Sequence, residues 1–151
     1  MSVAVNVHDL HEAEAFYKRW GPDVFVFCRL FLGDEQQAEA VSSKAFVEFY
    51  RHSGKLSVTG EVPSRLMALV FQAMQPCREG PRLDKDSDTL ENCILRLNCR
   101  QRAVFIMRNV MAMSWPGVAA ATSLSVEDAR QTWLKGMLTV RELLPRDFFE
   151  H

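Results

Sequence analysis

The sequence lacks long apolar runs, and its cysteines are not paired at a metal-binding spacing. No stretch reaches the roughly 18–20 apolar residues that a membrane helix needs, so we expect no membrane insertion. The first residues lack the basic region and apolar run of a signal peptide, which predicts a cytoplasmic protein. Because no CxxC pair is present, a zinc site is disfavoured and reduced thiols are expected. This expectation covers all four cysteines, Cys28, Cys77, Cys93 and Cys99.

Motifs for catalysis are missing as well. The chain has no glycine-rich phosphate loop, no nucleophile elbow and no recognisable pair of buried carboxylates. His8 and His11 stand three residues apart, with Glu12 and Glu14 beside them, which superficially resembles a metal site. One helix would supply that whole set, however, and HExxH spacing is absent, so we expect no bound metal. We therefore expect neither an enzyme nor a cofactor and assign no catalytic residue.

The sequence does have a globular composition with an uneven distribution of charge. Hydrophobic residues make up 48% and charged residues 25% of the 151 residues, which is enough apolar material for a buried core. Residues 1–51 hold five basic and eight acidic side chains, whereas residues 92–145 hold seven basic and three acidic. Only the second part is suited to binding phosphates.

Apolar residues recur at intervals of three and four, without a strand pattern, and this predicts an all-α fold. In the first part we expect four helices, separated by breaks at Gly21-Pro22 and Gly33-Asp34 and by a loop over residues 54–63. Residues 76–88, PCREGPRLDKDSD, predict a linker because they combine two prolines, a glycine and alternating charges. The predicted organisation is a helical domain at 9–75, the linker, and a second helical domain at 89–145.

Residues 114–144, SWPGVAAATSLSVEDARQTWLKGMLTVRELL, predict a helix-turn-helix. A short helix of small residues is broken near 122–125, and Ser125 is placed to cap a longer helix. The longer helix divides into an apolar face and a polar face, namely Val126, Ala129, Trp133, Met137, Val140 and Leu144 against Arg130, Gln131, Lys135 and Arg141. An αα-hairpin in an ordinary helical bundle fits the same spacing.

Several motifs give the chain a resemblance to a known family. Residues 97–105, LNCRQRAVF, resemble the "LP-x-x-x-R-x-V-F" opening of region 4 in bacterial RNA polymerase sigma factors of the extracytoplasmic-function (ECF) group. Residues 113–115 resemble that family's "LSY", and residues 125–130 its "S-V-x-x-V-K". In the first part, residues 32–34, Ala38-Glu39 and Phe46 match parts of region 2, including its "AED-x-x-Q-x-x-F" signature. The resemblance covers roughly residues 10–144.

The resemblance implies two helical domains, regions 2 and 4, that bind core RNA polymerase and promoter DNA. An anti-sigma protein is a further partner known for such proteins. Arginine, glutamine and lysine side chains on a recognition helix read bases and anchor phosphates. The residues expected to contact the upstream (minus thirty-five) element are Ser125, Glu127, Arg130, Gln131, Lys135, Arg100 and Arg102.

The resemblance also places two functions on the first part of the chain. Glu39, Lys44, Glu48 and Arg51 lie on one helical face and are expected to bind the polymerase. Surface ion pairs that contribute only about a few tenths of a kcal/mol each are the alternative for this set. The segment at residues 65–72 corresponds to the family's DNA-melting helix, which makes Phe71 and Gln72 the melting candidates.

The chain also departs from the family's pattern. Ala40 and Ser43 replace the Asp and Gln of the region 2 signature, and residues 65–72 lack the family's Trp and Asn. Thr132 and Met137 occupy positions that are often basic, and Gly117 stands where a Glu is usual. Two functions remain open on this pattern: a promoter-reading sigma factor, and a sigma-like interaction protein that has lost promoter melting or polymerase binding.

Overall fold

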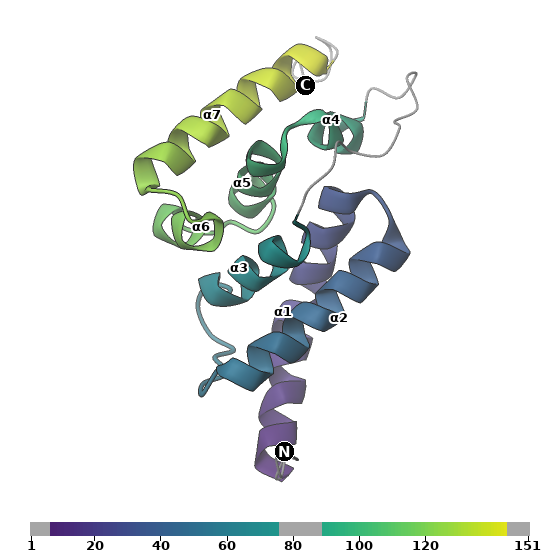
Figure 1. Cartoon of the computed structure of the whole chain (residues 1–151), viewed down its shortest axis with the longest axis vertical. Helices are drawn as coiled ribbons and strands as arrows, with labels where there is room; N and C mark the ends of the chain where they lie inside the picture. The colour runs from purple at the N-terminus through teal and green to yellow at the C-terminus, as the bar shows by residue number, and fades with distance from the viewer. Residues whose placement is uncertain (1–6, 76–88, 145–151) are drawn as a thin grey trace.

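The computed structural model describes residues 7–75 and 89–144. Within those ranges the chain forms seven α-helices and no strand, which confirms the all-α fold class (Figure 1). No helix in these ranges is long and apolar enough to cross a bilayer.

The first helix, α1 (Val7–Leu32), runs straight through the expected break at Gly21-Pro22. The prediction of two separate helices here was wrong. Apolar residues recur at helical spacing on both sides of the proline, and Phe16, Trp20, Val24, Phe27 and Phe31 are all buried. Burial of this continuous face outweighs the hydrogen bond that the proline removes.

Two further helices complete the first half of the chain, α2 (Glu35–His52) and α3 (Ser64–Ala73). Gly33 at φ +72° turns the chain back after α1, and the Asp34 side chain caps α2 by accepting the Gln37 N–H at 2.9 Å. Aromatic contacts then hold α2 against α1, with the rings of Phe16 and Phe49 stacked at 5.1 Å. The turn predicted at Gly33-Asp34 is confirmed.

The second half contains α4 (Leu90–Arg96), α5 (Cys99–Asn109), α6 (Trp115–Thr122) and α7 (Val126–Leu143). Thr89 caps α4, and Asn98 forms a capping box with Gln101 at the start of α5. Both caps are local in sequence, because each joins a side chain to a backbone N–H three residues later.

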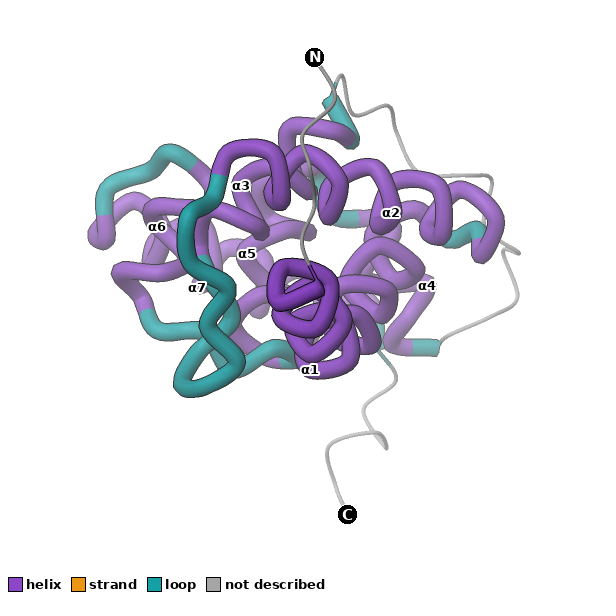
Figure 2. Tube along the Cα trace, turned by 90° about the horizontal axis from the view of Figure 1, so that it is seen from below, coloured by secondary structure: helices purple, strands orange, loops and turns teal. Residues whose placement is uncertain are grey.

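The two halves share one hydrophobic core. In Figure 1, α3 lies against α6, and the C-terminal part of α1 lies beside α4 and α5. Figure 2 views the molecule with α1 nearly end-on, and there α4 and α6 lie on opposite sides of it. The largest fully buried side chains come from both halves and include Phe27, Phe31, Leu66, Met67, Ile106, Met107 and Met113. The predicted linker, 76–88, lies outside the described residues, and the two-domain division stays a prediction.

The cysteines differ from the sequence-based expectation. Cys28 and Cys93 are buried, whereas Cys99 is disulfide-bonded. The expectation of a reduced thiol was therefore wrong at Cys99, since disulfide pairing depends on which side chains meet in space and not on their spacing in sequence. Cys77 lies outside the described residues.

Candidate nucleic-acid interface

Helices α6 and α7 form a compact pair, here called the α6–α7 unit, and a serine caps each of them. The Ser114 hydroxyl accepts the Gly117 N–H at 3.2 Å, and the Ser125 hydroxyl accepts the Asp128 N–H at 3.0 Å. Between the helices, Ser123 adopts a left-handed conformation with φ 57°, which ends α6 and redirects the chain. The cap predicted at Ser125 is confirmed.

The outer face of α7 carries the predicted contact residues. Glu127, Arg130, Gln131 and Lys135 are all exposed within its first three turns. Within the described part of the chain, neither Arg130 nor Lys135 lies within ion-pairing distance of a carboxylate. These two cations are therefore free to contact an anionic ligand.

The opposite face of α7 packs inward, largely as predicted. Ala129, Val140 and Leu144 are buried, and Trp133 and Met137 are partly buried. The sequence reading missed the burial of Gly136. A Cβ atom added at Gly136 would lie 3.6 Å from the Gln101 Cβ, so the small residue lets α7 approach α5 closely.

An aromatic cluster orients Arg130 on the surface of the α6–α7 unit. The guanidinium of Arg130 lies 5.7 Å from the centre of the Trp115 ring, and that of Arg108 lies 4.7 Å from it. Trp133 packs edge-on against Trp115 at 5.7 Å and donates its indole N–H to the Asn109 side-chain oxygen at 3.3 Å. Because cation–π attraction holds Arg130 toward α6, its side chain is partly ordered before any ligand arrives.

A shallow depression places Arg100 near the outer face of α7. It has a volume of about 400 Å³ and lies between the start of α5 and the middle of α7. The residues that line it are Asn98, Cys99, Arg100, Gln101, Thr132 and Lys135. The exposed cations Arg100 and Lys135 therefore border the same depression, and their contact with DNA stays a prediction.

Arg102 is the exception, and its assignment as a DNA contact is corrected. Its side chain is only 3% exposed. The guanidinium donates to the carbonyl oxygens of Phe31, Leu95 and Leu97 at 2.8, 2.8 and 3.1 Å, and it lies 4.9 Å from the Phe31 ring centre. Burial lowers the pKa of this guanidinium below its usual value. Arg102 joins the end of α1 to the end of α4 and is not available to a phosphate in this structure.

The two melting candidates on α3 have different surroundings. Phe71 is 9% exposed and packs edge-on against Phe31 at 6.3 Å, so it belongs to the core and its assignment to DNA melting is corrected. Gln72 is exposed. It lines a depression of about 220 Å³ together with Lys44 and Glu48 of α2, so the structure brings a melting candidate beside the predicted polymerase surface.

The predicted polymerase surface on α2 is largely exposed. Glu39, Lys44 and Arg51 are exposed and Glu48 is partly buried. Glu48 lies 3.1 Å from Arg51 and 3.6 Å from His52, which is an ordinary surface ion-pair arrangement. Lys44 and Glu39 have no ion-pair partner within the described residues. Both interpretations of this face, docking surface and surface ion pairs, fit these contacts.

One contact that the sequence analysis missed joins Glu61 to the start of α6. The Glu61 carboxylate accepts the Ser114 backbone N–H through Oε1 and the Ser114 hydroxyl through Oε2, the latter at 3.0 Å. The two residues are 53 positions apart, so no local pattern predicts the contact. The signal that was present in the sequence is the missing acid at position 117, three residues after the cap.

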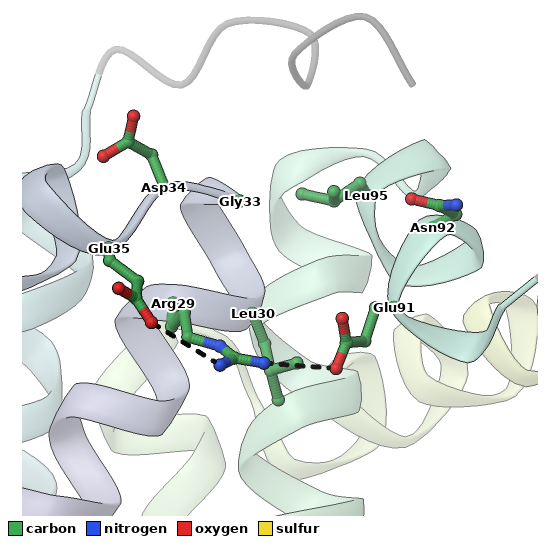
Figure 3. Close-up of a pocket in the computed structure, with 8 residues that line it drawn as sticks. All are labelled: Arg29, Leu30, Gly33, Asp34, Glu35, Glu91, Asn92 and Leu95. Carbon is green, nitrogen blue, oxygen red and sulfur yellow. Dashed lines mark hydrogen bonds and ion pairs between the residues drawn. The ribbon is translucent and has the colours of Figure 1, made fainter. Parts of the chain in front are cut away.

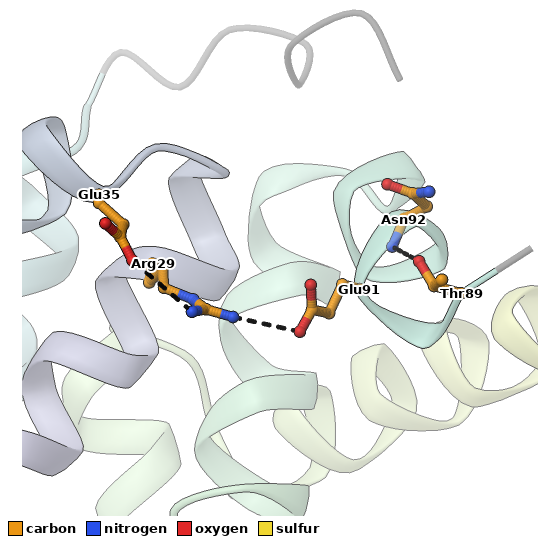
Figure 4. Close-up of polar contacts among 5 residues, drawn as sticks. All are labelled: Arg29, Glu35, Thr89, Glu91 and Asn92. Atoms are coloured by element: carbon orange, nitrogen blue, oxygen red, sulfur yellow. Dashed lines mark hydrogen bonds and ion pairs between the residues drawn. The ribbon is translucent and has the colours of Figure 1, made fainter. Parts of the chain in front are cut away.

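A second contact between the halves surrounds Arg29, close to the end of α1. Its guanidinium lies 3.9 Å from a Glu35 oxygen at the start of α2 and 3.3 Å from a Glu91 oxygen on α4 (Figure 3). These three side chains border a depression of about 250 Å³. Figure 4 shows the same bridge beside the Thr89 cap, whose hydroxyl accepts the Asn92 N–H at 3.2 Å. All three charged groups are substantially exposed, so the bridge adds little stability.

The described residues contain no group of three or more His, Cys, Asp and Glu side chains that is placed to hold a metal ion. The chain matches no protein-family model and no curated protein sequence. The functional argument therefore depends on the residues and their geometry.

Proposed function

We propose that this chain is a sigma-type transcription initiation factor of the ECF group, which binds core RNA polymerase and directs it to promoter DNA. In this proposal α7 is the recognition helix and reads the upstream element in the major groove, while α6 crosses the phosphate backbone. The chain works in the cytoplasm, on DNA, and only together with the polymerase.

The observation that supports the proposal most strongly is the outer face of α7. Arg130, Gln131 and Lys135 project from its first three turns, the part of the helix where helix-turn-helix proteins contact base edges, and the two cations lack carboxylate partners within the described residues. Arginine binds guanine and glutamine binds adenine through paired hydrogen bonds, and lysine anchors phosphates. Arg100 adds a further cation across the hollow beside Lys135.

Two observations favour the second candidate, a sigma-like interaction protein. Phe71 lies in the core, so α3 offers no exposed aromatic ring at the expected melting position. Leu134 and Leu138 are 47% and 52% exposed one turn apart on α7, and neighbouring exposed apolar side chains are a feature of protein-binding faces. Both candidate functions use the same helices to bind a partner. They differ in whether promoter DNA is one of the partners.

Co-purification with core RNA polymerase tests the proposal. We expect the chain to co-elute with the core enzyme, and Lys44→Glu to weaken that association by reversing an exposed charge on α2. Lys18→Glu is the matched control, because Lys18 is an exposed lysine on α1 outside the predicted polymerase surface. Failure of the parent protein to associate with the core enzyme would refute the sigma-factor proposal.

A further inference from the structure

We propose that Glu61 is a detachable cap for α6 and that it latches the first half of the chain onto the α6–α7 unit. The cap latch consists of three residues: Glu61, Ser114 and Gly117. Ser114 begins α6 and satisfies the Gly117 N–H with its own hydroxyl oxygen. Glu61 then satisfies the two donors of Ser114, the backbone N–H and the hydroxyl.

This arrangement completes a capping box from a distant part of the chain. In a capping box, an acid three residues after the cap reaches back to the backbone N–H of the capping residue. That position in α6 is residue 117, which is glycine and has no side chain to offer. Glu61 makes the missing hydrogen bond instead. The hydrogen bond that completes the cap of α6 therefore also joins the two halves of the chain.

Gly117 is also required for Glu61 to fit. A Cβ atom added at Gly117 would lie 2.4 Å from Glu61 Oε2, which is closer than non-bonded atoms approach. The obstructing atom is the end of a flexible side chain, so a larger residue at 117 would displace Glu61 and leave the backbone of α6 in place. Residues 61 and 117 are thus mutually exclusive as sources of the capping carboxylate.

The rest of the first half holds Glu61 in position. The loop that carries it is fixed to α1 by the Trp20 indole N–H, which donates to the Ser57 carbonyl oxygen at 2.9 Å. Val62, the next residue, is buried, and α3 begins at Ser64 and packs against α6. Glu61 and Ser114 themselves are exposed. Water competes for such hydrogen bonds, so the latch can open while the shared hydrophobic core stays packed.

Opening the latch exposes the N-terminal end of α6 to other anions. The start of a helix carries partial positive charge and unpaired N–H groups, and it favours phosphate as readily as carboxylate. The first helix of a helix-turn-helix lies against the DNA backbone. If the chain binds DNA as proposed above, Glu61 therefore places a negative charge where the duplex approaches, and the latched form binds DNA more weakly than the open form.

The experiment exchanges the distant cap for a local one. Gly117→Glu supplies the carboxylate at the third position of α6 and displaces Glu61, so helix content should be kept while the hydrogen bonds between Glu61 and Ser114 are lost. Hydrogen exchange measured by mass spectrometry should become about tenfold faster in α3, the factor expected for the loss of one surface hydrogen bond to a charged group. Glu12→Ala, on the exposed face of α1, is the control and should leave both the helix content and the exchange rate in α3 unchanged.

A second pair of variants distinguishes loss of the contact between the two halves from loss of the α6 cap alone. Glu61→Ala should speed exchange both in α3 and at the start of α6, because it removes the cap as well as the latch. Adding Gly117→Glu to Glu61→Ala should restore protection at the start of α6 alone, with α3 still exchanging fast. If Gly117→Glu and Glu61→Ala both leave the exchange rate in α3 at the parent value, α3 is held on α6 without the latch and the proposal is wrong.

DNA binding distinguishes this inference from the proposed function. With a short random-sequence duplex, Glu61→Gln should tighten binding about two- to fivefold, the effect of one charge near a helix start, whereas Gly117→Glu should not, because it returns a carboxylate to the start of α6. Faster α3 exchange without any DNA binding by parent or variants would support the latch and refute the DNA-binding proposal. DNA binding together with unchanged α3 exchange would refute the latch and leave the proposed function standing.

Discussion

Arg102 carries its charge into the interior without a carboxylate partner among the described residues. Three carbonyl oxygens replace that partner: those of Phe31 at the end of α1, and of Leu95 and Leu97 at the end of α4. The last carbonyl groups of a helix lack backbone partners and carry partial negative charge. At this site they accept hydrogen bonds from the buried guanidinium, in place of the water molecules that would solvate an exposed one. Of the three guanidinium nitrogens, Nε has no hydrogen-bond partner among the described residues.

Removing the Arg102 guanidinium should destabilise the protein strongly. Arg102→Met keeps an apolar stem of similar length and leaves three buried acceptors without donors, each costing about 1–3 kcal/mol. We expect a loss of at least about 3 kcal/mol in the free energy of unfolding, measured with urea. The matched control, Arg100→Ala, removes an exposed arginine two residues away and should change stability by less than about 0.5 kcal/mol. Equal, small effects of both changes would contradict the bridging role of Arg102.

Cys28 gives the stability a predictable dependence on pH. Burial raises the pKa of its thiol from 9.0 to about 12. The unfolded chain therefore releases this proton first, so the contribution of Cys28 to stability is complete below pH 9 and is lost as the pH rises toward 12. The pKa of Tyr50 is also raised to about 12, first by burial and then by the neighbouring Tyr17, and it acts in the same direction.

The Cys28 prediction is tested by urea unfolding at about pH 8 and about pH 10. The parent protein should lose stability between these two values. Cys28→Ala should be less stable than the parent at the lower pH, because it leaves a small cavity, but its stability should fall less on going to the higher pH. An identical pH dependence in the two proteins would show that the Cys28 thiol does not titrate differently on folding.

At the scale of the helices, local chemistry was readable from the sequence and tertiary packing was not. The caps at Ser125 and Asp34 act within three residues, so their patterns identified the starts of α7 and α2. Gly21-Pro22 also carries a local signal, a helix break, but the buried face of α1 overrides it. Arg102 and Phe71 were misplaced for the same reason, since nothing near them in sequence reveals their contacts with Phe31.

The turn between α5 and α6 contains a strained residue that a substitution can relieve. Ala112 has φ 54°, a left-handed conformation that costs an L-residue with a Cβ atom roughly 1 kcal/mol or more. Ala112→Gly should therefore stabilise the protein by about 1 kcal/mol in thermal or urea unfolding. The same change at Ala120, an exposed position within α6, should instead destabilise by about 0.5–1 kcal/mol. If Ala112→Gly is destabilising to the same degree as Ala120→Gly, the turn conformation described here is incorrect.

At the scale of the whole molecule, charge separates the two halves, which nevertheless pack around one core. The acidic first half supplies Glu61 to α6, while the cations Arg130, Lys135 and Arg100 face outward from the second half. The sequence predicted this asymmetry of charge and the outer face of α7. It did not predict that α3 would pack against α6, because that contact joins segments about fifty residues apart.

The salt dependence of DNA binding follows from this distribution of charge. If the intact chain binds duplex DNA, its affinity should fall steeply as salt rises, because each neutralised phosphate releases counterions. Lys135→Ala should weaken binding to every sequence and reduce the slope of log affinity against log salt by about one. Lys18→Ala, on the opposite half of the chain, should leave the slope unchanged. An affinity that does not respond to salt would indicate a protein partner in place of DNA.

The most direct test of the central claim is a promoter-library selection with holoenzyme reconstituted from core RNA polymerase and this chain. The parent should initiate from a subset of sequences that share an upstream element. Arg130→Ala should relax the preference at one or two base pairs of that element, since a paired arginine contact contributes about 1–3 kcal/mol of discrimination. Arg130→Lys should restore only part of the preference, because an ammonium group lacks the planar fork of the guanidinium.

Arg141→Ala, near the end of α7, is the control for that selection and should select the same sequences as the parent. A preference that neither Arg130 variant alters would mean that the recognition face has been misplaced. Failure of the parent holoenzyme to initiate from any sequence in the library would contradict the account as a whole, and the interaction-protein alternative would then take its place.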